Sequence, residues 1–351
     1  MQFGGRYTVI GEPFNGGMGA VYPCRDEILD RPVAVKIVRE GSEQRRMVDE
    51  VQALLKLRSK HVVQAYDLLK FQDGTIAVVQ EFIEGSDLFD EATHAGSTEQ
   101  LYKQLWQIAT GIRDIHLANL IHRDIKPNNM KVDREGVIKI FDFGLARNEG
   151  PDASTLGFVG TRGFAAPELY MNRAVFTPSI DVYAFGASAV YLANRNLPSE
   201  LMEVPPLPPT PSFIERLNGG IAPDIKASIA QCLSPAAGER PTMESVRHLL
   251  SRYLLVNRHQ ALLVSQGQPS YLHAGNRTVS ANLPGIGGIS INYNSLDFIV
   301  RSIEGEVYIN NMPARVNQAL PGSCVIALGS PRLANSRRYI TFDLSSPEVV
   351  L

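Results

Sequence analysis

The sequence His122-Arg123-Asp124-Ile125-Lys126-Pro127-Asn128-Asn129 is followed, thirteen residues after Asn129, by Asp142-Phe143-Gly144. Hard cations such as Mg²⁺ prefer carboxylate and amide oxygens, so Asn129 and Asp142 are candidate metal ligands. The carboxylate of Asp124 can accept the proton of a hydroxyl group and orient that hydroxyl. The two stretches therefore predict one site that combines a hydroxyl-orienting carboxylate with bound magnesium.

Length and composition predict a folded chain of two domains. The 351 residues exceed one average domain, and 34 Lys and Arg nearly balance 36 Asp and Glu. No basic field indicates a nucleic-acid partner. The three cysteines are odd in number and far apart, which is typical of a reducing compartment. No signal peptide and no transmembrane helix are predicted, so we expect a cytoplasmic protein without membrane insertion.

Residue patterns along the first two thirds of the chain predict strands followed by helices. Residues 7–40 and 75–83 have the β-branched runs of strands. Residues 43–58 and 98–120 place apolar residues at helical spacing, and further helical stretches continue to about residue 255. The apolar stretch Val182–Ala193 is too short to span a membrane and predicts a buried core helix. The proline-rich residues 204–211 predict a stiff loop, with recruitment of a partner as the alternative.

A glycine-rich turn and a strand lysine predict phosphate binding near the N-terminus. Gly16, Gly17 and Gly19 lie between two expected strands, where glycine lets backbone amides approach phosphates closely. Lys36 follows Gly19 by seventeen residues on an apolar strand, so its ammonium is a candidate ligand for the α- and β-phosphates. Glu50, on the following helix, is a candidate ion-pair partner for Lys36.

These motifs together resemble the eukaryotic-like (Hanks-type) Ser/Thr protein kinase family, in its bacterial or phage form, over about residues 7–255. The resemblance is specific because independent motifs occur in the family's order. They are Gly16–Tyr22, Val33–Lys36, Glu50, His122–Asn129, Asp142–Gly144, Gly160-Thr161, Ala166-Pro167-Glu168, Asp181 and Arg240.

The resemblance implies an α+β, bilobal protein-kinase fold over residues 1–255. A β-rich N-lobe would extend to about residue 84 and an α-rich C-lobe would follow over 85–255. It also implies ATP- and Mg²⁺-dependent phosphorylation of Ser and Thr hydroxyls on protein substrates. Asp124 would be the catalytic base, Lys126 would stabilise the γ-phosphate, and Lys36 with Glu50 would hold the other phosphates.

The resemblance also assigns the nucleotide site. Asn129 and Asp142 would be the magnesium ligands. Backbone groups of the hinge residues Glu81 and Ile83 would bind adenine, and Gln80 would be the gatekeeper before them. Asp87 would bind the ribose. Apolar contact to the adenine ring would come from Val21 and Ala34.

Regulatory and structural roles follow by the same resemblance. Arg123 would meet a phosphate on the activation segment 148–163, where Ser154, Thr155 and Thr161 are candidate autophosphorylation sites and Thr155 is preferred. Thr161 would also contact Asp124 and Lys126, which favours Ser/Thr over Tyr as acceptor. Three further residues would be structural: Glu168 and Arg240 as a buried ion pair, and Asp181 as a brace for the catalytic loop.

The sequence departs from the family pattern at four positions, one of which is Asn128 in place of the usual acidic residue or serine. Phe14 occupies the place of the first glycine of the phosphate loop. Glu50 follows Lys36 by only fourteen residues, which is closer than usual. Lys131 stands where an apolar residue normally forms the floor of the adenine pocket, and its aliphatic stem can serve while its charge reaches solvent.

The last part of the chain predicts a separate all-β domain. We expect a linker over 256–270 and short strands joined by turns over 271–351. Residues 297–342 resemble the second half of a forkhead-associated domain, a β-sandwich that binds phosphothreonine. A phosphopeptide is therefore a candidate partner there, and a scaffold that docks substrate or restrains the kinase is the alternative.

The leading hypothesis is a Ser/Thr protein kinase with a β-rich regulatory domain. A pseudokinase scaffold that acts through the β domain is the main alternative. A small-molecule phosphotransferase is a third hypothesis, but such enzymes lack the combination of Lys126 with Gly160-Thr161 and Ala166-Pro167-Glu168.

Overall fold

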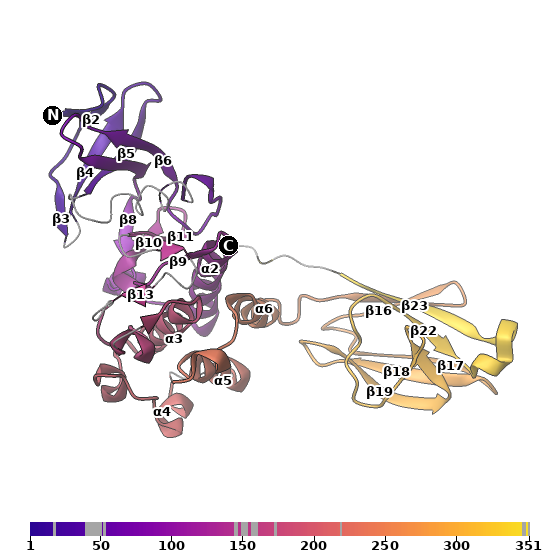
Figure 1. Ribbon diagram of the computed structural model, residues 1–351. Helices are drawn as coiled ribbons and strands as arrows, with labels where there is room; N and C mark the ends of the chain where they lie inside the picture. Colours follow the sequence, from indigo (N-terminus) through magenta and orange to yellow (C-terminus); the bar gives the residue numbers. More distant parts are fainter. Residues whose placement is uncertain are drawn as a thin grey trace. The chain divides into compact units, whose positions relative to one another are not determined.

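The computed structural model describes residues 1–16, 19–38, 51, 54–143, 147–148, 154–155, 161–171, 174–217, 220–345 and 349. The chain forms two compact units, which divide between Leu250 and Ser251. Figure 1 shows the first unit as a strand-rich layer followed by helices, and the second unit as strands with a short 3₁₀ turn before β23 (Arg338–Leu344).

The N-lobe of the first unit is an antiparallel sheet in the order β1-β2-β4-β5-β7-β6, with β3 paired to β4. Apolar residues at alternate positions point inward, so Val33, Val35, Ala77 and Val79 are buried in one apolar cluster. The strands are β1 (Gln2–Phe3), β2 (Tyr7–Val9), β3 (Phe14–Gly16), β4 (Gly19–Asp26), β5 (Arg31–Val38), β6 (Ala65–Lys70) and β7 (Ile76–Glu81).

Small sheets connect the N-lobe to the helices. The strand β10 (Met130–Asp133) pairs with β11 (Ile138–Ile140) and with β8 (Gly85–Asp87). A Cβ atom on Gly85 would lie 1.8 Å from the carbonyl oxygen of Val132, so only glycine permits this pairing. Two further short pairs are β9 (Leu120–Ile121) with β12 (Arg147–Asn148), and β13 (Ser154–Thr155) with β14 (Ala174–Val175).

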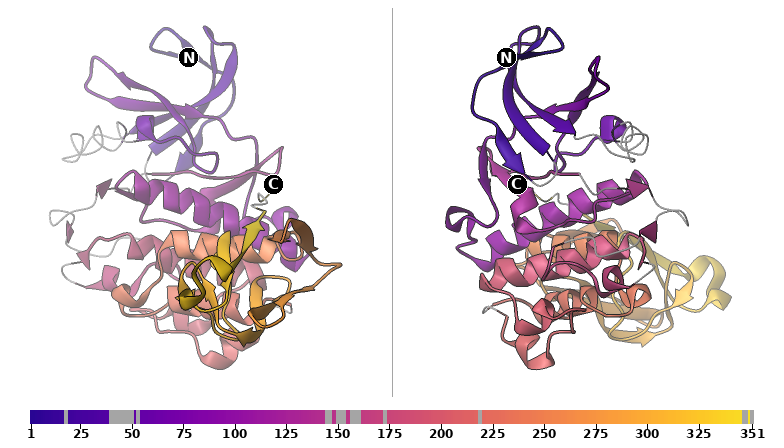
Figure 2. Two further views of the ribbon diagram at one scale, coloured as in Figure 1. Left: turned by 90° about the vertical axis from the view of Figure 1, so that its right-hand side faces the viewer. Right: turned by 60° about the vertical axis from the view of Figure 1, so that its left-hand side comes forward.

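Helices form the C-lobe, which lies beside the N-lobe sheet as a separate layer (Figure 2). The helix α2 begins after Ser97, whose side chain accepts from the Gln100 N–H, while Gln100 Oε1 accepts from the Gly96 N–H. This reciprocal cap satisfies two otherwise unpaired donors. The helices are α2 (Thr98–Leu117), α3 (Ser179–Asn194), α4 (Pro211–Glu215), α5 (Pro223–Cys232) and α6 (Met243–Leu254), with 3₁₀ turns at Glu91–Thr93, Pro127–Asn129, Pro167–Tyr170, Ser199–Met202 and Ala237–Glu239. A further 3₁₀ turn, Pro331–Ser336, belongs to the second unit.

The helix α3 is buried on every side from Ile180 to Ala193, as expected for a core helix. Among the described residues, no helix combines the length and apolar character that crossing a membrane requires.

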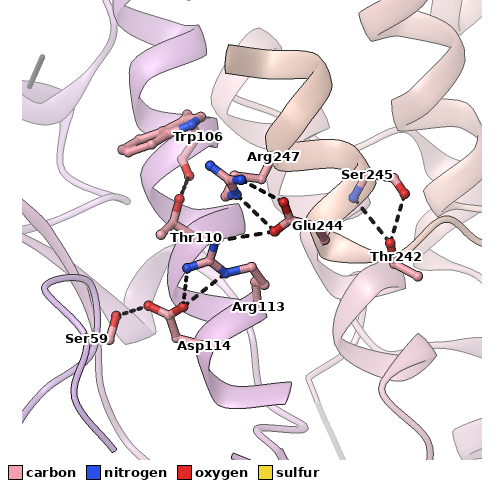
Figure 3. A network of polar contacts seen from close by, with 9 residues as sticks. All are labelled: Ser59, Trp106, Thr110, Arg113, Asp114, Thr242, Glu244, Ser245 and Arg247. Atoms are coloured by element: carbon pink, nitrogen blue, oxygen red, sulfur yellow. Dashed lines mark hydrogen bonds and ion pairs between the residues drawn. The ribbon is translucent and has the colours of Figure 1, made fainter. Parts of the chain in front are cut away.

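A polar network links three segments of the first unit. Asp114 on α2 accepts from the Ser59 hydroxyl at 2.5 Å and from Arg113 at 2.6 Å. Arg113 also reaches Glu244 on α6, which pairs with Arg247 (Figure 3). The segment that precedes β6 is thereby connected to α2, and α2 is connected to α6.

The second unit is a β-sandwich. A six-stranded sheet, β16-β15-β23-β22-β20-β21, and a three-stranded sheet, β17-β18-β19, share one apolar core that includes Ile291, Tyr293, Ile326 and Phe342. The strands are β15 (Ala261–Ser265), β16 (Gln268–Leu272), β17 (Thr278–Leu283), β18 (Gly287–Tyr293), β19 (Phe298–Gly305), β20 (Val307–Ile309), β21 (Met312–Pro313), β22 (Cys324–Leu328) and β23 (Arg338–Leu344).

The sandwich begins earlier than the sequence indicates. The expected linker, residues 256–270, contains β15 and most of β16, and β15 pairs with β23 from the far end of the unit. Ala261 and Leu263 belong to the core. The sequence alone indicates a linker here, because the apolar residues of β15 become buried only when β15 pairs with β23. The forkhead-associated likeness and the phosphopeptide partner stay predictions.

Candidate active site

Lys36 and Asp142 meet at the boundary between the two lobes. The strand β5 carries Lys36, and the Lys36 ammonium lies 2.5 Å from Asp142 Oδ1. Burial alone would raise the pKa of Asp142, but the Lys36 charge outweighs it and the pKa falls below its ordinary value. Asp142 also adopts a left-handed backbone with a φ of 68°. A non-glycine residue held in this conformation is typical of functional sites.

Asp124 lies at the centre of a second polar cluster. Its carboxylate accepts from the Lys126 ammonium at 2.7 Å, from the Thr161 hydroxyl at 2.8 Å and from the Asn129 amide at 2.9 Å. Lys126 also donates to the Thr161 hydroxyl at 2.7 Å. The structure therefore brings these four predicted residues together, and the carboxylate is held in one orientation by three donors.

The backbone of the catalytic loop is fixed by a buried carboxylate on α3. Asp181 accepts from the backbone N–H groups of His122 and Arg123 at 2.8 Å each, and from His116 Nε2 at 3.0 Å. Arg123 has a φ of 69°, so this turn needs external support. Burial alone would raise the pKa of Asp181, but the bond from His116 and the neighbouring donors lower it instead.

His122 connects the catalytic loop to the segment that carries Asp142. Its ring nitrogen Nε2 lies 3.0 Å from the carbonyl oxygen of Phe141, and its ring packs in a tilted arrangement against Phe143, with 4.7 Å between the ring centres. Burial lowers the pKa of His122, so the neutral imidazole is favoured and Nε2 donates to that carbonyl. The Phe141 N–H in turn donates to the Asn129 carbonyl at 3.0 Å, which places the two candidate metal ligands just beyond the paired ends of β10 and β11.

The residues present fit a magnesium ion that is shared with phosphate oxygens. The Asn129 amide nitrogen is used by Asp124, which leaves the Asn129 side-chain oxygen as the atom available for a cation. Asp142 is ionised at neutral pH because its pKa is lowered. One carboxylate and one amide oxygen are hard ligands, and Mg²⁺ in such sites completes its shell with substrate phosphates and water.

The expected hinge is held by an ion pair that the sequence did not reveal. The Glu81 carboxylate lies 2.8 Å from the Lys139 ammonium of β11. This pair ties the end of β7 to the C-lobe, next to the buried Ile83. Asp87 lies beside Lys131 in the register of β8 and β10. No sequence motif marked Lys139, because its role depends on a contact between strands of two different sheets, with 58 positions between the two residues.

The structure describes some of the remaining predicted residues and leaves others outside the described ranges. Arg240 and Glu168 form a bidentate pair at 2.7 and 2.8 Å, and the Arg123 guanidinium lies over the Phe176 ring. Val21 and Ala34 lie on β4 and β5, which are neighbouring strands of the N-lobe sheet. Ser154 and Thr155 form β13. Four predicted positions lie outside the described residues: Gly17, Glu50, Gly144 and Gly160.

We expect the support from Asp181 to depend on pH. Because its pKa is lower in the folded chain than the ordinary value of 3.8, its contribution to stability is complete above that pH and is lost as the pH falls through the folded pKa. Asp181→Asn should therefore be less stable than wild type at pH 7. In chemical denaturation the gap should shrink below pH 3.8, and a gap independent of pH would contradict this assignment.

Comparison with known proteins identifies the family. The model of the protein kinase domain matches residues 7–250, which are most of the chain. The chain therefore belongs to the protein kinase family, and the predicted family and bilobal α+β fold are confirmed.

Two curated bacterial proteins are similar to this chain over the same part. "Probable serine/threonine-protein kinase pknA2" of Bifidobacterium longum is 29% identical over 256 residues, which cover 68% of this chain and 33% of that protein. "Serine/threonine-protein kinases drp72" of Corynebacterium efficiens is 33% identical over 228 residues, which cover 58% of this chain and 44% of that protein. The match thus spans less than half the length of either relative.

Proposed function

We propose that this chain is a protein kinase that transfers the γ-phosphate of ATP to Ser or Thr hydroxyls of protein substrates, with Mg²⁺. One observation carries the proposal: Asp124 is bound by Lys126, Asn129 and Thr161. This cluster presents a fixed carboxylate beside a cation, which is the arrangement that phosphoryl transfer to a hydroxyl needs.

In the proposed reaction, Asp124 accepts the proton of the acceptor hydroxyl as the new phosphorus–oxygen bond forms and the bond to ADP breaks. Lys126 offsets the charge of the transferred phosphate from the side of Asp124. Lys36 binds the α- and β-phosphates from the N-lobe, next to Asp142, which its ammonium contacts. Asn129 and Asp142 would hold magnesium, which neutralises phosphate oxygens.

Thr161 supports a Ser/Thr acceptor. Its hydroxyl bridges Lys126 and Asp124, so it lies next to the place where the acceptor oxygen would bind. This contact holds the segment around Thr161 close to the catalytic carboxylate, which favours the short reach of Ser and Thr over the long reach of Tyr.

The test is transfer of labelled γ-phosphate from ATP to casein by the purified chain, with Mg²⁺ or with EDTA. We expect labelled phosphoserine and phosphothreonine only with Mg²⁺. Label on tyrosine alone would overturn the Ser/Thr assignment. Nucleotide binding without any transfer would instead favour the pseudokinase scaffold, and transfer to aminoglycosides or choline but not to protein would favour the small-molecule enzyme.

We further predict autophosphorylation within residues 148–163. A phosphate there would add a double negative charge near Arg123, which can order the segment. Mass spectrometry after incubation with ATP and Mg²⁺ should find phosphate on Thr155, Ser154 or Thr161, with Thr155 the preferred site. Phosphate-free peptides covering all three residues in an enzyme that labels casein would contradict this regulation without affecting the proposed activity.

A further inference from the structure

Lys131 lies near the boundary between the lobes and differs from the other lysines there, which form ion pairs with carboxylates. It lies on β10, and its ammonium is 6.0 Å from the centre of the Phe14 ring and 5.8 Å from the centre of the Phe141 ring. Phe14 belongs to β3 of the N-lobe and Phe141 directly precedes Asp142. Both distances are within the range of cation–π attraction.

The surroundings of Lys131 differ from those of the catalytic lysines. Lys36 contacts Asp142 and Lys126 contacts Asp124. Within the described ranges, no carboxylate forms an ion pair with Lys131. Its neighbour in register, Asp87, instead accepts from the backbone N–H groups that follow it, with Oδ1 2.8 Å from the nitrogen of Phe89. The Lys131 ammonium therefore faces aromatic rings.

The strand register places these rings next to the Lys36–Asp142 pair. Phe14 pairs with Val21, and Val21 pairs with Lys36, so Phe14 lies on the hairpin beside the strand that carries Lys36. Phe141 directly precedes Asp142, which the Lys36 ammonium contacts. A planar base between this hairpin and β10 needs about 3.5–4 Å to the atoms on each face. The present 6.0 Å between the Lys131 ammonium and the Phe14 ring is less than the total of about 7–8 Å, so a base stacks on the ammonium only when the exposed Phe14 ring moves aside.

We propose that Lys131 is a specificity-determining residue of the nucleotide site, which binds the face of the purine ring by a cation–π contact. The inserted base takes the position that the Phe14 ring now has above the ammonium. An apolar floor residue would give the base only dispersion contacts. This inference rests on the proposed use of ATP and adds to it a residue that recognises the base and not the phosphates.

The inference makes the effect of Lys131 depend on the presence of a base. Lys131→Met keeps an unbranched stem of similar length and removes the charge. We expect it to weaken ATP binding about threefold to tenfold, and to leave the binding of inorganic tripolyphosphate within twofold of wild type. Lys131→Arg keeps a cation that stacks on rings, so ATP affinity should return to within about twofold of wild type.

Isothermal titration of the full chain with ATP and with tripolyphosphate, both with Mg²⁺, tests this. Lys70→Met is the matched control, because it removes one exposed lysine at the end of β6. Equal weakening of both ligands by Lys131→Met would overturn the inference in favour of phosphate attraction. Unchanged or tighter ATP binding would overturn it as well. A wild-type chain that binds no ATP would overturn the proposed function itself, which is a different result.

Discussion

Replacing Asp124 by asparagine is expected to lower phosphate transfer about a thousandfold, within the 10²–10⁴ range that a general base contributes. Asparagine is the same size and its side-chain oxygen can still accept from Lys126 or Thr161. It cannot take up the proton of the acceptor hydroxyl. The change therefore removes the chemistry and keeps most of the contacts. The measurement is kcat for labelling of casein with saturating ATP and Mg²⁺.

Two controls make this prediction specific. Glu135→Gln neutralises an exposed acid in the turn between β10 and β11 and should leave kcat within about twofold. ATP affinity of Asp124→Asn should also stay near the wild-type value, because Asp142 and Lys36 are intact. If Asp124→Asn retains more than a tenth of the wild-type kcat, Asp124 is not the base.

Replacing Glu168 by alanine is expected to lower the free energy of unfolding by about 3 kcal/mol, the lower end of the range for breaking a buried pair. The Arg240 side chain is fully buried, and both guanidinium ends donate to Glu168. Without Glu168, a buried cation keeps only carbonyl partners such as Ser179 and Ser234. The melting temperature should fall by about 6–12 °C for a unit of this size.

Glu244→Ala is the matched control for Glu168→Ala. Glu244 also pairs with two arginines, and its bond to Arg247, which is the largest cause, holds its pKa at about 2. Its side chain is 53% exposed, however, so water screens the pairs and the expected loss is below about 1 kcal/mol. Equal losses in the two variants would show that burial of Arg240 does not determine the stability of this pair.

The contiguous motifs were sufficient to predict the centre of the site. His122–Asn129 carries several predicted site residues within a short stretch, and Asp142-Phe143-Gly144 follows it closely, so their order indicated the family. The structure brings Lys36 to Asp142 and Lys126 to Asp124, as the motifs predict. The burial of α3 was also predictable, because its apolar residues cover every side of the helix.

Contacts between segments that lie far apart in the chain were not predictable from the sequence. Lys139 reaches Glu81 only because β11 and β7 come together, and neither residue lies in a motif. β15 falls within the predicted linker, because its partner strand, β23, comes about 75 residues later in the chain. The proximity of Lys131 to Phe14 and Phe141 likewise requires three separate elements to meet.

The central claim is that Asp142 and its neighbours form a magnesium–triphosphate site, and the Mg²⁺ dependence of ATP binding tests it most directly. Calorimetry should show that Mg²⁺ tightens ATP binding to the wild type by about tenfold. In Asp142→Asn this gain should disappear, while ATP binding without Mg²⁺ remains because Lys36 keeps its charge. An equal gain from Mg²⁺ in both proteins would contradict the account.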